Sequence, residues 1–195
     1  MKVFIDCGGH FGEGFAHFQR HLKIDPSWKV IMFEPNKVSA KRLREKHLPW
    51  WKHQMKIDVE LREEIAWNRD GARTFTATTW GDNGGESCGV GSTAMARENW
   101  DVPNAAEEYE VPTCDLSKII HSFDKTDWIY LKLDVEGSEV DILEGLIKSN
   151  AIDRVVHTWV EWHSRMFKDP REYNIRKRDV RAELKRRGTN CWDWQ

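Results

Sequence analysis

Four short apolar runs are spread along this chain, and each of them ends in a carboxylate. The runs cover residues 3–6, 30–34, 128–134 and 155–161, and their last residues are Asp6, Glu34, Asp134 and Glu161. Runs rich in valine, isoleucine, leucine and aromatic residues are typical of parallel strands that are buried on both faces. Because the carboxyl ends of such strands share one edge of a sheet, and ligands bind there, the four acids predict a binding site.

Helical patterns separate these runs, at residues 14–22, 39–47, 115–123, 139–149 and 174–187. The alternation predicts an α/β fold with a mostly parallel central sheet flanked by helices. At the start of the helix at 139–149, Ser138 and Asp141 have the spacing of a capping box.

The segment 55–111 departs from this alternation. It contains a predicted strand at 73–79 and then a loop at 81–91 with five glycines in eleven residues. A loop of this length is either a surface connection or a substrate lid.

Length and composition exclude several classes of protein. The 195 residues predict one domain, 1–195, and the net charge of −2 lacks the excess that draws a chain to nucleic acid or an anionic membrane. The four cysteines are too widely spaced for a metal motif or a dense disulfide framework. The sequence shows no signal-peptide pattern and no long apolar stretch, so we expect a cytoplasmic protein without a membrane partner.

A glycine-rich turn follows the first run, in the sequence Cys7-Gly8-Gly9-His10-Phe11-Gly12-Glu13-Gly14. Glycines let a backbone approach a ligand closely, and the helix that follows presents N–H groups to an anion. The turn lacks the Lys-Ser or Lys-Thr of a P-loop and departs from the dinucleotide fingerprint. Asp6, directly before it, would repel a phosphate and attract an ammonium group. A cofactor that carries a free ammonium and a carboxylate fits this pattern, and S-adenosylmethionine has that shape.

The second acid supports a nucleoside cofactor. Glu34 lies 22 residues after Gly12, close to the ~20 at which an acid accepts ribose hydroxyls in such βαβ units. Pro35 then ends the strand. We therefore expect Glu34 to bind the ribose.

Motifs along the chain resemble the FkbM-type methyltransferases, over about Lys2 to Trp192. The motifs are Asp6-x-Gly-Gly-x-x-Gly, Phe33-Glu34-Pro35-Asn36, Ala66-Trp67 ahead of Asp70-Gly71 and Phe75, and Lys132-x-Asp134-x-Glu136-Gly137-x-Glu139 with Leu143 and Gly145. The resemblance implies a Rossmann-like class I fold and O-methyl transfer from S-adenosylmethionine, often to sugars or natural-product hydroxyls.

The resemblance also implies that Ala66 and Trp67 lie near the adenine. The cofactor site that we expect consists of Asp6, Gly8, Gly9, His10, Phe11, Gly12, Glu34, Pro35, Ala66 and Trp67. The chain departs from the family in two places. His10 stands where asparagine is more frequent, and the carboxy-terminal antiparallel strand pair is expected to be shortened or missing.

Three residues are candidates for the chemical step. Transfer to a hydroxyl needs an in-line approach and is helped by removal of the hydroxyl proton. We expect Asp134 nearest the methyl group, with Glu161 or His163 as the base; His163 has the better intrinsic pKa. These residues could alternatively bind a divalent cation, but the sequence has no metal-ligand spacing, so we predict no metal.

The expected acceptor is a small molecule or a glycan with a hydroxyl group. Two alternatives remain: an RNA ribose methyltransferase, supported by the basic helix at 174–187, and a non-catalytic module that only binds S-adenosylmethionine. Nucleic acid is the less favoured partner, because the paired lysines expected around the acid for ribose methylation are absent and Lys132 alone lies in the strand. The oligomeric state cannot be predicted from the sequence.

Overall fold

The computed structural model describes residues 1–78, 91–96 and 105–194. Apart from Gly91, the glycine-rich loop and its possible role as a lid lie outside the described residues.

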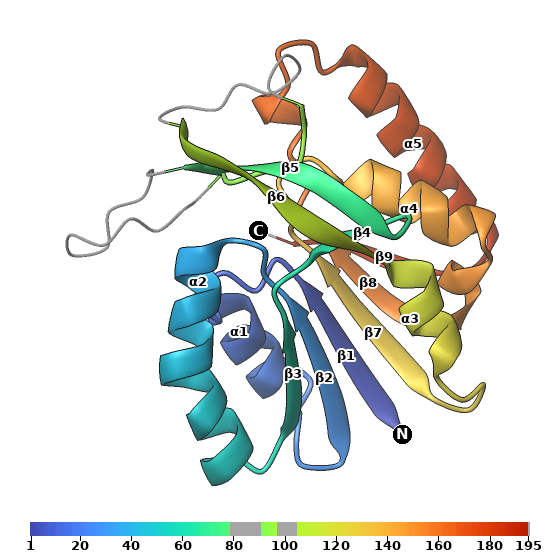
Figure 1. Cartoon of the computed structure of the whole chain (residues 1–195). Helices are drawn as coiled ribbons and strands as arrows, with labels where there is room; N and C mark the ends of the chain where they lie inside the picture. The colour runs from blue at the N-terminus through green and yellow to red at the C-terminus, as the bar shows by residue number, and fades with distance from the viewer. Residues whose placement is uncertain (79–90, 97–104, 195) are drawn as a thin grey trace.

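A six-stranded sheet forms the centre of the molecule (Figure 1). Its order is β3-β2-β1-β7-β8-β9, and every neighbouring pair is parallel. The strands are β1 (Lys2–Cys7), β2 (Trp28–Phe33), β3 (Asp58–Arg62), β7 (Trp128–Leu133), β8 (Val155–Val160) and β9 (Asn190–Asp193). The four apolar runs are the four inner strands, which confirms the predicted α/β class and the Rossmann-like arrangement.

The edge strand β9 matches the expectation of a shortened carboxy-terminal region. It has four residues and pairs parallel with β8. Within the described part of the chain, no antiparallel strand joins this sheet.

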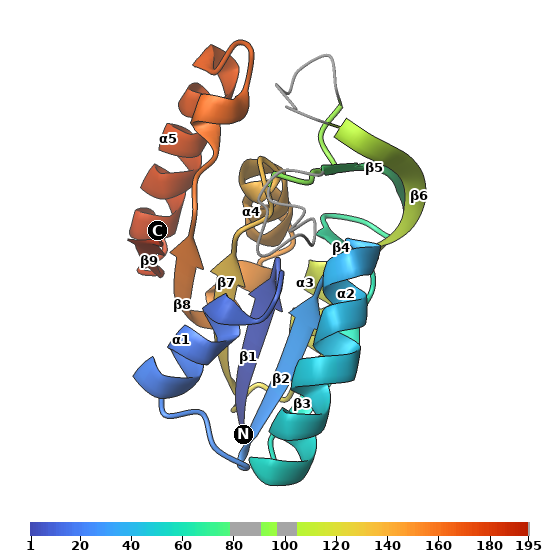
Figure 2. The same cartoon turned by 90° about the vertical axis from the view of Figure 1, so that its left-hand side faces the viewer.

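Helices cover both faces of the sheet (Figures 1 and 2). One face carries α1 (Glu13–His21) and α2 (Lys37–Arg42), and the other carries α3 (Leu116–Ser122), α4 (Glu139–Lys148) and α5 (Arg171–Arg186). The helix predicted at 39–47 begins earlier because the Asn36 side chain caps it, accepting hydrogen bonds from the amides of Val38 (2.9 Å) and Ser39 (3.3 Å). The chain continues from α2 into π-helical turns at Leu43–His47 and Trp50–Gln54.

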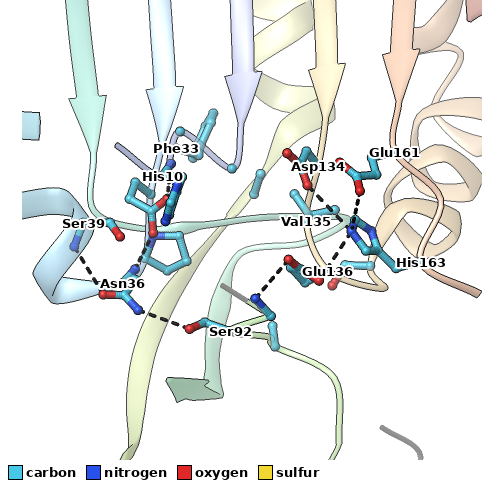
Figure 3. Close-up of a pocket in the computed structure, with 18 of the residues that line it drawn as sticks. His10, Phe33, Asn36, Ser39, Ser92, Asp134, Val135, Glu136, Glu161 and His163 are labelled. Atoms are coloured by element: carbon cyan, nitrogen blue, oxygen red, sulfur yellow. Dashed lines mark hydrogen bonds and ion pairs between the residues drawn. The ribbon is translucent and has the colours of Figure 1, made fainter. Parts of the chain in front are cut away.

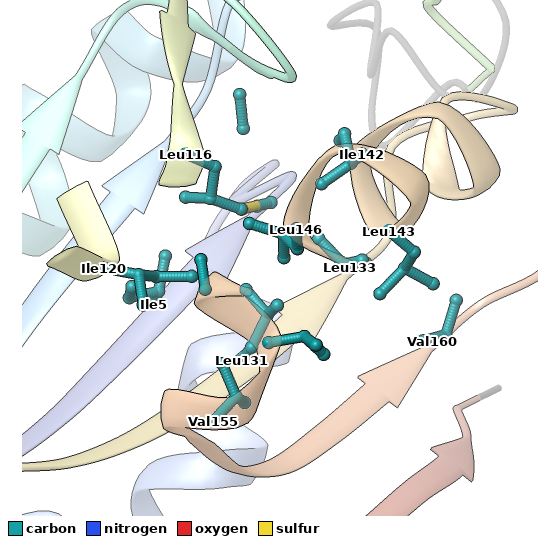
Figure 4. Packing of buried hydrophobic residues seen from close by; sticks show 14 of the residues in the cluster. Ile5, Leu116, Ile120, Leu131, Leu133, Ile142, Leu143, Leu146, Val155 and Val160 are labelled. Carbon is teal, nitrogen blue, oxygen red and sulfur yellow. The ribbon is translucent and has the colours of Figure 1, made fainter. Parts of the chain in front are cut away.

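The core around the main sheet has two parts, because side chains of the central strand alternate between its faces. Val3 and Ile5 of β1 pack in the cluster with α3, α4 and α5, part of which is shown in Figure 4. Phe4 packs on the opposite side, with Phe15 and Phe18 of α1. Burial on both faces explains why these strands read as continuous apolar runs in the sequence.

The capping box predicted before α4 is wrong. Ser138 is the N-cap, but its hydroxyl makes no capping hydrogen bond, and Asp141 pairs with Arg176 instead (2.6 Å). The turn is held by the fully buried Glu139, whose carboxylate accepts from the amide of Gly137 (3.0 Å).

A second, three-stranded sheet comes from the segment that departs from the alternation. It has the order β4-β6-β5, with β4 (Ile65–Trp67) parallel and β5 (Gly71–Thr78) antiparallel to β6 (Ala105–Asp115). This sheet lies beyond the carboxyl ends of the main strands (Figure 1). Three residues of this sheet, Ile65, Ala66 and Phe75, line a cavity at that edge.

No helix in the described part of the chain combines the length and the apolar character that a membrane crossing requires.

Candidate active site

A cavity of about 410 Å³ lies between the two sheets. Its wall is formed by residues that follow β1, β2, β7 and β8, and by Ile65, Ala66, Phe75 and Ala94 on the side of the small sheet. Of the four strand-end acids, Glu34, Asp134 and Glu161 line it. Figure 3 shows His10 and Asn36 on one side of this cavity and Asp134, Glu136, Glu161 and His163 on the other. We name the first group, together with Glu34 that is bonded to its amides, the turn end, and the second group the acid end.

The glycine-rich turn is fixed by close packing. Gly8 has a φ of +90°, and a Cβ there would lie 1.8 Å from the carbonyl oxygen of Asp134. The amides of Gly8 and Gly9 both donate to the carbonyl of Phe33 at 3.0 Å. These two residues line the cavity while their amides are engaged by Phe33, so their contact with a cofactor stays a prediction.

The rest of the turn divides between the cavity and the core. His10 lines the cavity, whereas Phe11 is buried beneath the guanidinium of Arg42 (4.2 Å). A Cβ on Gly12 would lie 2.8 Å from the ring of Trp51. Phe11 and Gly12 therefore shape the turn without reaching the cavity.

Asp6 lies behind the cavity wall. It is fully buried, and its carboxylate accepts a hydrogen bond from Lys132 Nζ at 3.0 Å. The same ammonium donates to the carbonyl of Gly8 (2.8 Å) and lies 3.4 Å from Asp134. Burial alone would lower the pKa of Lys132, but the charges of Asp6 and Asp134 raise it, so the side chain stays charged. The ammonium that Asp6 binds in this structure is that of Lys132, and a direct contact between Asp6 and a ligand in the cavity is not available.

Glu34 is the acid of the turn end, and it is 5% exposed. Its two oxygens accept hydrogen bonds from the amides of His10 (2.6 Å) and Asn36 (2.8 Å). Burial raises its pKa to about 7, against the lowering effect of these two hydrogen bonds. Each carboxylate oxygen can accept a further bond, so Glu34 can bind hydroxyl groups of a ligand in the cavity.

The expected adenine region is only partly in the cavity. Ala66 lines it beside Ile65, and so does Pro35. Trp67 is buried, and its ring lies 4.1 Å from the guanidinium of Arg73. Trp67 thus packs within the small sheet.

The acid end surrounds one buried histidine with carboxylates. Nε2 of His163 lies 3.4 Å from Glu136, 3.5 Å from Glu161 and 3.8 Å from Asp134. Figure 3 shows these carboxylates pointing toward the ring from the ends of β7 and β8. The structure therefore brings the three predicted catalytic residues together and adds Glu136.

A hydrogen-bonded network fixes the other side of the histidine ring. Nδ1 of His163 lies 2.8 Å from Glu139, which also accepts from the hydroxyl of Tyr173 (2.7 Å). Burial would lower the pKa of His163, but hydrogen bonds to Glu139 and Glu161 and the nearby carboxylate charges raise it to about 11. Without a bound cation these carboxylates favour the protonated ring, which has no lone pair for a general base, whereas a cation bound at Nε2 would displace that proton. The raised pKa thus makes His163 a poorer general base than the sequence suggests, and its role in catalysis stays a prediction.

Sequence reasoning missed Tyr173 and the segment 91–96. Tyr173 lies in α5 and gives no local signal, because its partner Glu139 is 34 positions away in the sequence. In the segment 91–96, the amide of Gly91 donates to Glu136 (3.1 Å), and Ser92 accepts from the Asn36 side chain (3.2 Å). These contacts join the turn end to the acid end.

Comparisons with known proteins give two findings. A family model described as the Methyltransferase FkbM domain matches residues 6–190. Among solved structures, the methyltransferase FkbM from Methylobacillus flagellatus KT is similar at 17% identity and a TM-score of 0.47, over 78% of this chain and 31% of that one. This chain thus spans less than a third of the length of that protein. Among curated proteins no match was found.

Proposed function

This chain belongs to the FkbM methyltransferase family, and from that premise we propose that it transfers the methyl group of S-adenosylmethionine to a hydroxyl group of a sugar or glycan. The observation that carries the proposal is Glu34 at the end of β2, held by backbone amides beside the glycine-rich turn and facing the cavity. A carboxylate fixed in this way is suited to accept the two hydroxyls of a ribose.

The cavity fits the cofactor in size and chemistry. Its volume of about 410 Å³ falls in the range of roughly 300–1,000 Å³ typical of small-molecule sites. Glu34 would bind the ribose, Ala66 and Ile65 would lie beside the adenine, and Gly8 and Gly9 would lie along the amino-acid portion. When bound, the cofactor supplies an electrophilic methyl group.

The acid end would hold the acceptor. The carboxylates of Asp134 and Glu161 are about a quarter exposed, so they can accept hydrogen bonds from hydroxyl groups in the cavity. Alignment of the acceptor oxygen with the methyl group removes much of the entropic barrier, and a carboxylate that accepts the hydroxyl proton assists as the bond forms. A sugar presents several hydroxyls at once, which suits an end lined by several acids.

The negative charge of the acid end disfavours the RNA alternative. Asp134, Glu136 and Glu161 would repel the phosphates on either side of a ribose. In α5, Arg176 pairs with Asp141 and Glu144 at 2.6 Å, so part of the basic helix is already neutralised. The chain therefore favours an uncharged, hydroxyl-rich acceptor.

Calorimetry with S-adenosylhomocysteine tests the cofactor. We expect micromolar binding to the wild type, no comparable binding of NAD, and at least ~10-fold weaker binding after Glu34→Ala, because charged hydrogen bonds contribute roughly 1.5–3 kcal/mol each. The matched control is Glu45→Ala, an exposed acid on the π-helical turn after α2, which should bind normally. Tight NAD binding, or equal affinity for both variants, would contradict the proposal.

Transfer of a radiolabelled methyl group tests the reaction. A panel of sugars, oligosaccharides and RNA, each incubated with the full chain and labelled S-adenosylmethionine, should give labelled sugar and unlabelled RNA. Label in RNA supports the first alternative. Cofactor binding with no transfer to any acceptor supports a non-catalytic module.

A further inference from the structure

We propose that the acid end is a binding site for one divalent metal cation, with Asp134, Glu136 and His163 as its ligands. One donor atom from each of these residues lies within 4.8 Å of the others. All three come from segments at the carboxyl ends of β7 and β8, and their side chains converge on one side of the cavity (Figure 3).

The distances between the donors fit a shared central ion. Nε2 of His163 lies 3.4 Å from Glu136 Oε2 and 3.8 Å from Asp134 Oδ1. These separations exceed the ~2.7–3.2 Å of a nitrogen-to-oxygen hydrogen bond. Ligands that each lie about 2.0–2.2 Å from one metal ion are separated by roughly 3–4 Å. The spacing is that of ligands around an ion.

Partners on the outer side orient each donor toward this centre. Nδ1 of His163 is held by the fully buried Glu139 at 2.8 Å, the carboxylate–histidine arrangement that fixes a metal-binding imidazole. The second oxygen of Glu136 accepts from the amide of Gly91 (3.1 Å). The second oxygen of Asp134 lies 3.4 Å from the ammonium of Lys132. Each donor is thus anchored through the atom that faces away from the centre.

The negative charge of the acid end and a buried hydroxyl without a partner also support a bound cation. Four carboxylates, those of Asp134, Glu136, Glu139 and Glu161, face one imidazole ring. Lys132 and Arg165, which lies 4.0 Å from Glu161, add two positive charges nearby, and Lys132 also neutralises the buried Asp6, so the carboxylates remain in excess. Ser138 lies in the wall of the same cavity, 1% exposed, and its hydroxyl has no hydrogen-bond partner among the described residues. A hydrated cation would balance the excess of acid, and one of its water ligands would be a partner for this hydroxyl once the side chain turns toward the cavity.

The donor set selects the kind of metal. Carboxylates suit hard cations such as Mg²⁺ and Mn²⁺, and imidazole suits first-row transition metals, so Mn²⁺, which belongs to both groups, matches the donor set. Glu161, 3.5 Å from Nε2, lies where it can add a third carboxylate. Positions left open on the ion could bind two neighbouring hydroxyls of the acceptor and lower the pKa of one of them. This last role rests on the proposed function, whereas the binding of the ion does not.

Electron paramagnetic resonance with Mn²⁺ as the probe tests the site without cofactor or acceptor. The full chain, freed of metal with a chelator, should bind one Mn²⁺ with micromolar affinity. Asp134→Asn and Glu136→Gln should each weaken that affinity at least tenfold. The matched control is Asp58→Asn, which removes a carboxylate at the start of β3, where it pairs with Lys29, and should bind Mn²⁺ as the wild type does.

A spectroscopic signature keeps the test valid if a variant does not fold. The bound Mn²⁺ of the wild type should show nitrogen hyperfine coupling from a histidine ligand, and His163→Gln should abolish it. Absence of the coupling in the wild type, or equal Mn²⁺ binding by all variants, would overturn the proposal. Because S-adenosylhomocysteine binding is measured separately, failure of the metal site leaves the proposed methyl transfer standing, and the reverse also holds.

Discussion

The two ends of the cavity hold their carboxylates by different means. At the turn end, Glu34 is bonded by backbone amides, one of them only two residues away at Asn36. Behind the acid end, the fully buried Glu139 holds His163 in place and is itself bonded by the side chain of Tyr173. The first arrangement follows once β1 and β2 are paired. The second requires α4, α5 and the segment after β8 to dock together.

This difference determines what a substitution should do. A change at the turn end should alter ligand binding and leave the fold intact, because the backbone there is held by its own hydrogen bonds. A change in the network at the acid end should cost stability, because removal of one partner leaves another polar group buried and unpaired. The predictions below test that contrast, beginning with the largest effect.

Gly8→Ala should destabilise the fold although Gly8 belongs to the glycine-rich turn, because Gly8 packs directly against Asp134 of the acid end. Its Cβ would lie 1.8 Å from the Asp134 carbonyl, and the φ of +90° disfavours any side chain. The expected loss in the free energy of unfolding is more than about 4 kcal/mol, measured by urea denaturation. Gly188→Ala is the control: its φ is +75°, but nothing lies within 4 Å of the added Cβ. It should lose only about 1–2 kcal/mol, and equal losses would show that the close packing at Gly8 is unimportant.

Asp134→Asn should separate chemistry from cofactor binding. The substitution preserves shape but removes the charge that holds the acceptor hydroxyl, so turnover should fall by about 10²–10⁴. The affinity for S-adenosylhomocysteine, set at the turn end, should stay within about twofold. A thermal melt beside the kinetics distinguishes lost chemistry from lost folding. Wild-type turnover would remove Asp134 from the reaction.

The same contrast explains what the sequence could predict. The four inner strands and Glu34 were predictable because each is signalled locally, by an apolar run or by its distance from the glycine turn. The small sheet was largely missed, since β6 carries charged residues such as Glu107 and Glu110 that do not read as a strand. Asp6 was predicted to face a ligand, yet its partner Lys132 is 126 positions away. A pairing between side chains so far apart in the sequence cannot be predicted from a local sequence pattern.

Tyr173→Phe should destabilise the acid end without affecting the cofactor. The hydroxyl donates to a fully buried carboxylate at 2.7 Å, so its loss should cost about 1.5–3 kcal/mol, the range for a charged hydrogen bond. The matched variant at the turn end is Tyr109→Phe, whose hydroxyl bonds the carbonyl of Pro35 (3.3 Å) and the amide of Lys37 (3.2 Å). These neutral bonds predict a loss of about 0.5–1.5 kcal/mol. If urea denaturation gave the larger loss for Tyr109→Phe, the contrast between the ends would be wrong.

The pH dependence of cofactor binding should come from the turn end and should be the smallest effect. Because burial raises the pKa of Glu34 to about 7, the carboxyl is mostly protonated at pH 6 and mostly ionised at pH 8. The ionised form is the better acceptor for ribose hydroxyls, so the affinity for S-adenosylhomocysteine should rise over this interval, by less than about tenfold.

Folding should respond to Glu34 with the opposite sign. The folded state binds this proton more tightly than the unfolded chain, whose carboxyl has a pKa of 4.5. The contribution of Glu34 to stability is therefore full below pH 4.5 and is lost as the pH rises toward about 7. Glu34→Gln should remove both dependences, leaving calorimetric affinity flat between about pH 6 and 8. A variant that kept the wild-type pH profile would show that another group titrates, and Glu34 would then be ionised throughout. Since its carboxylate already accepts two backbone amides, that result would mean that these hydrogen bonds outweigh the cost of burial.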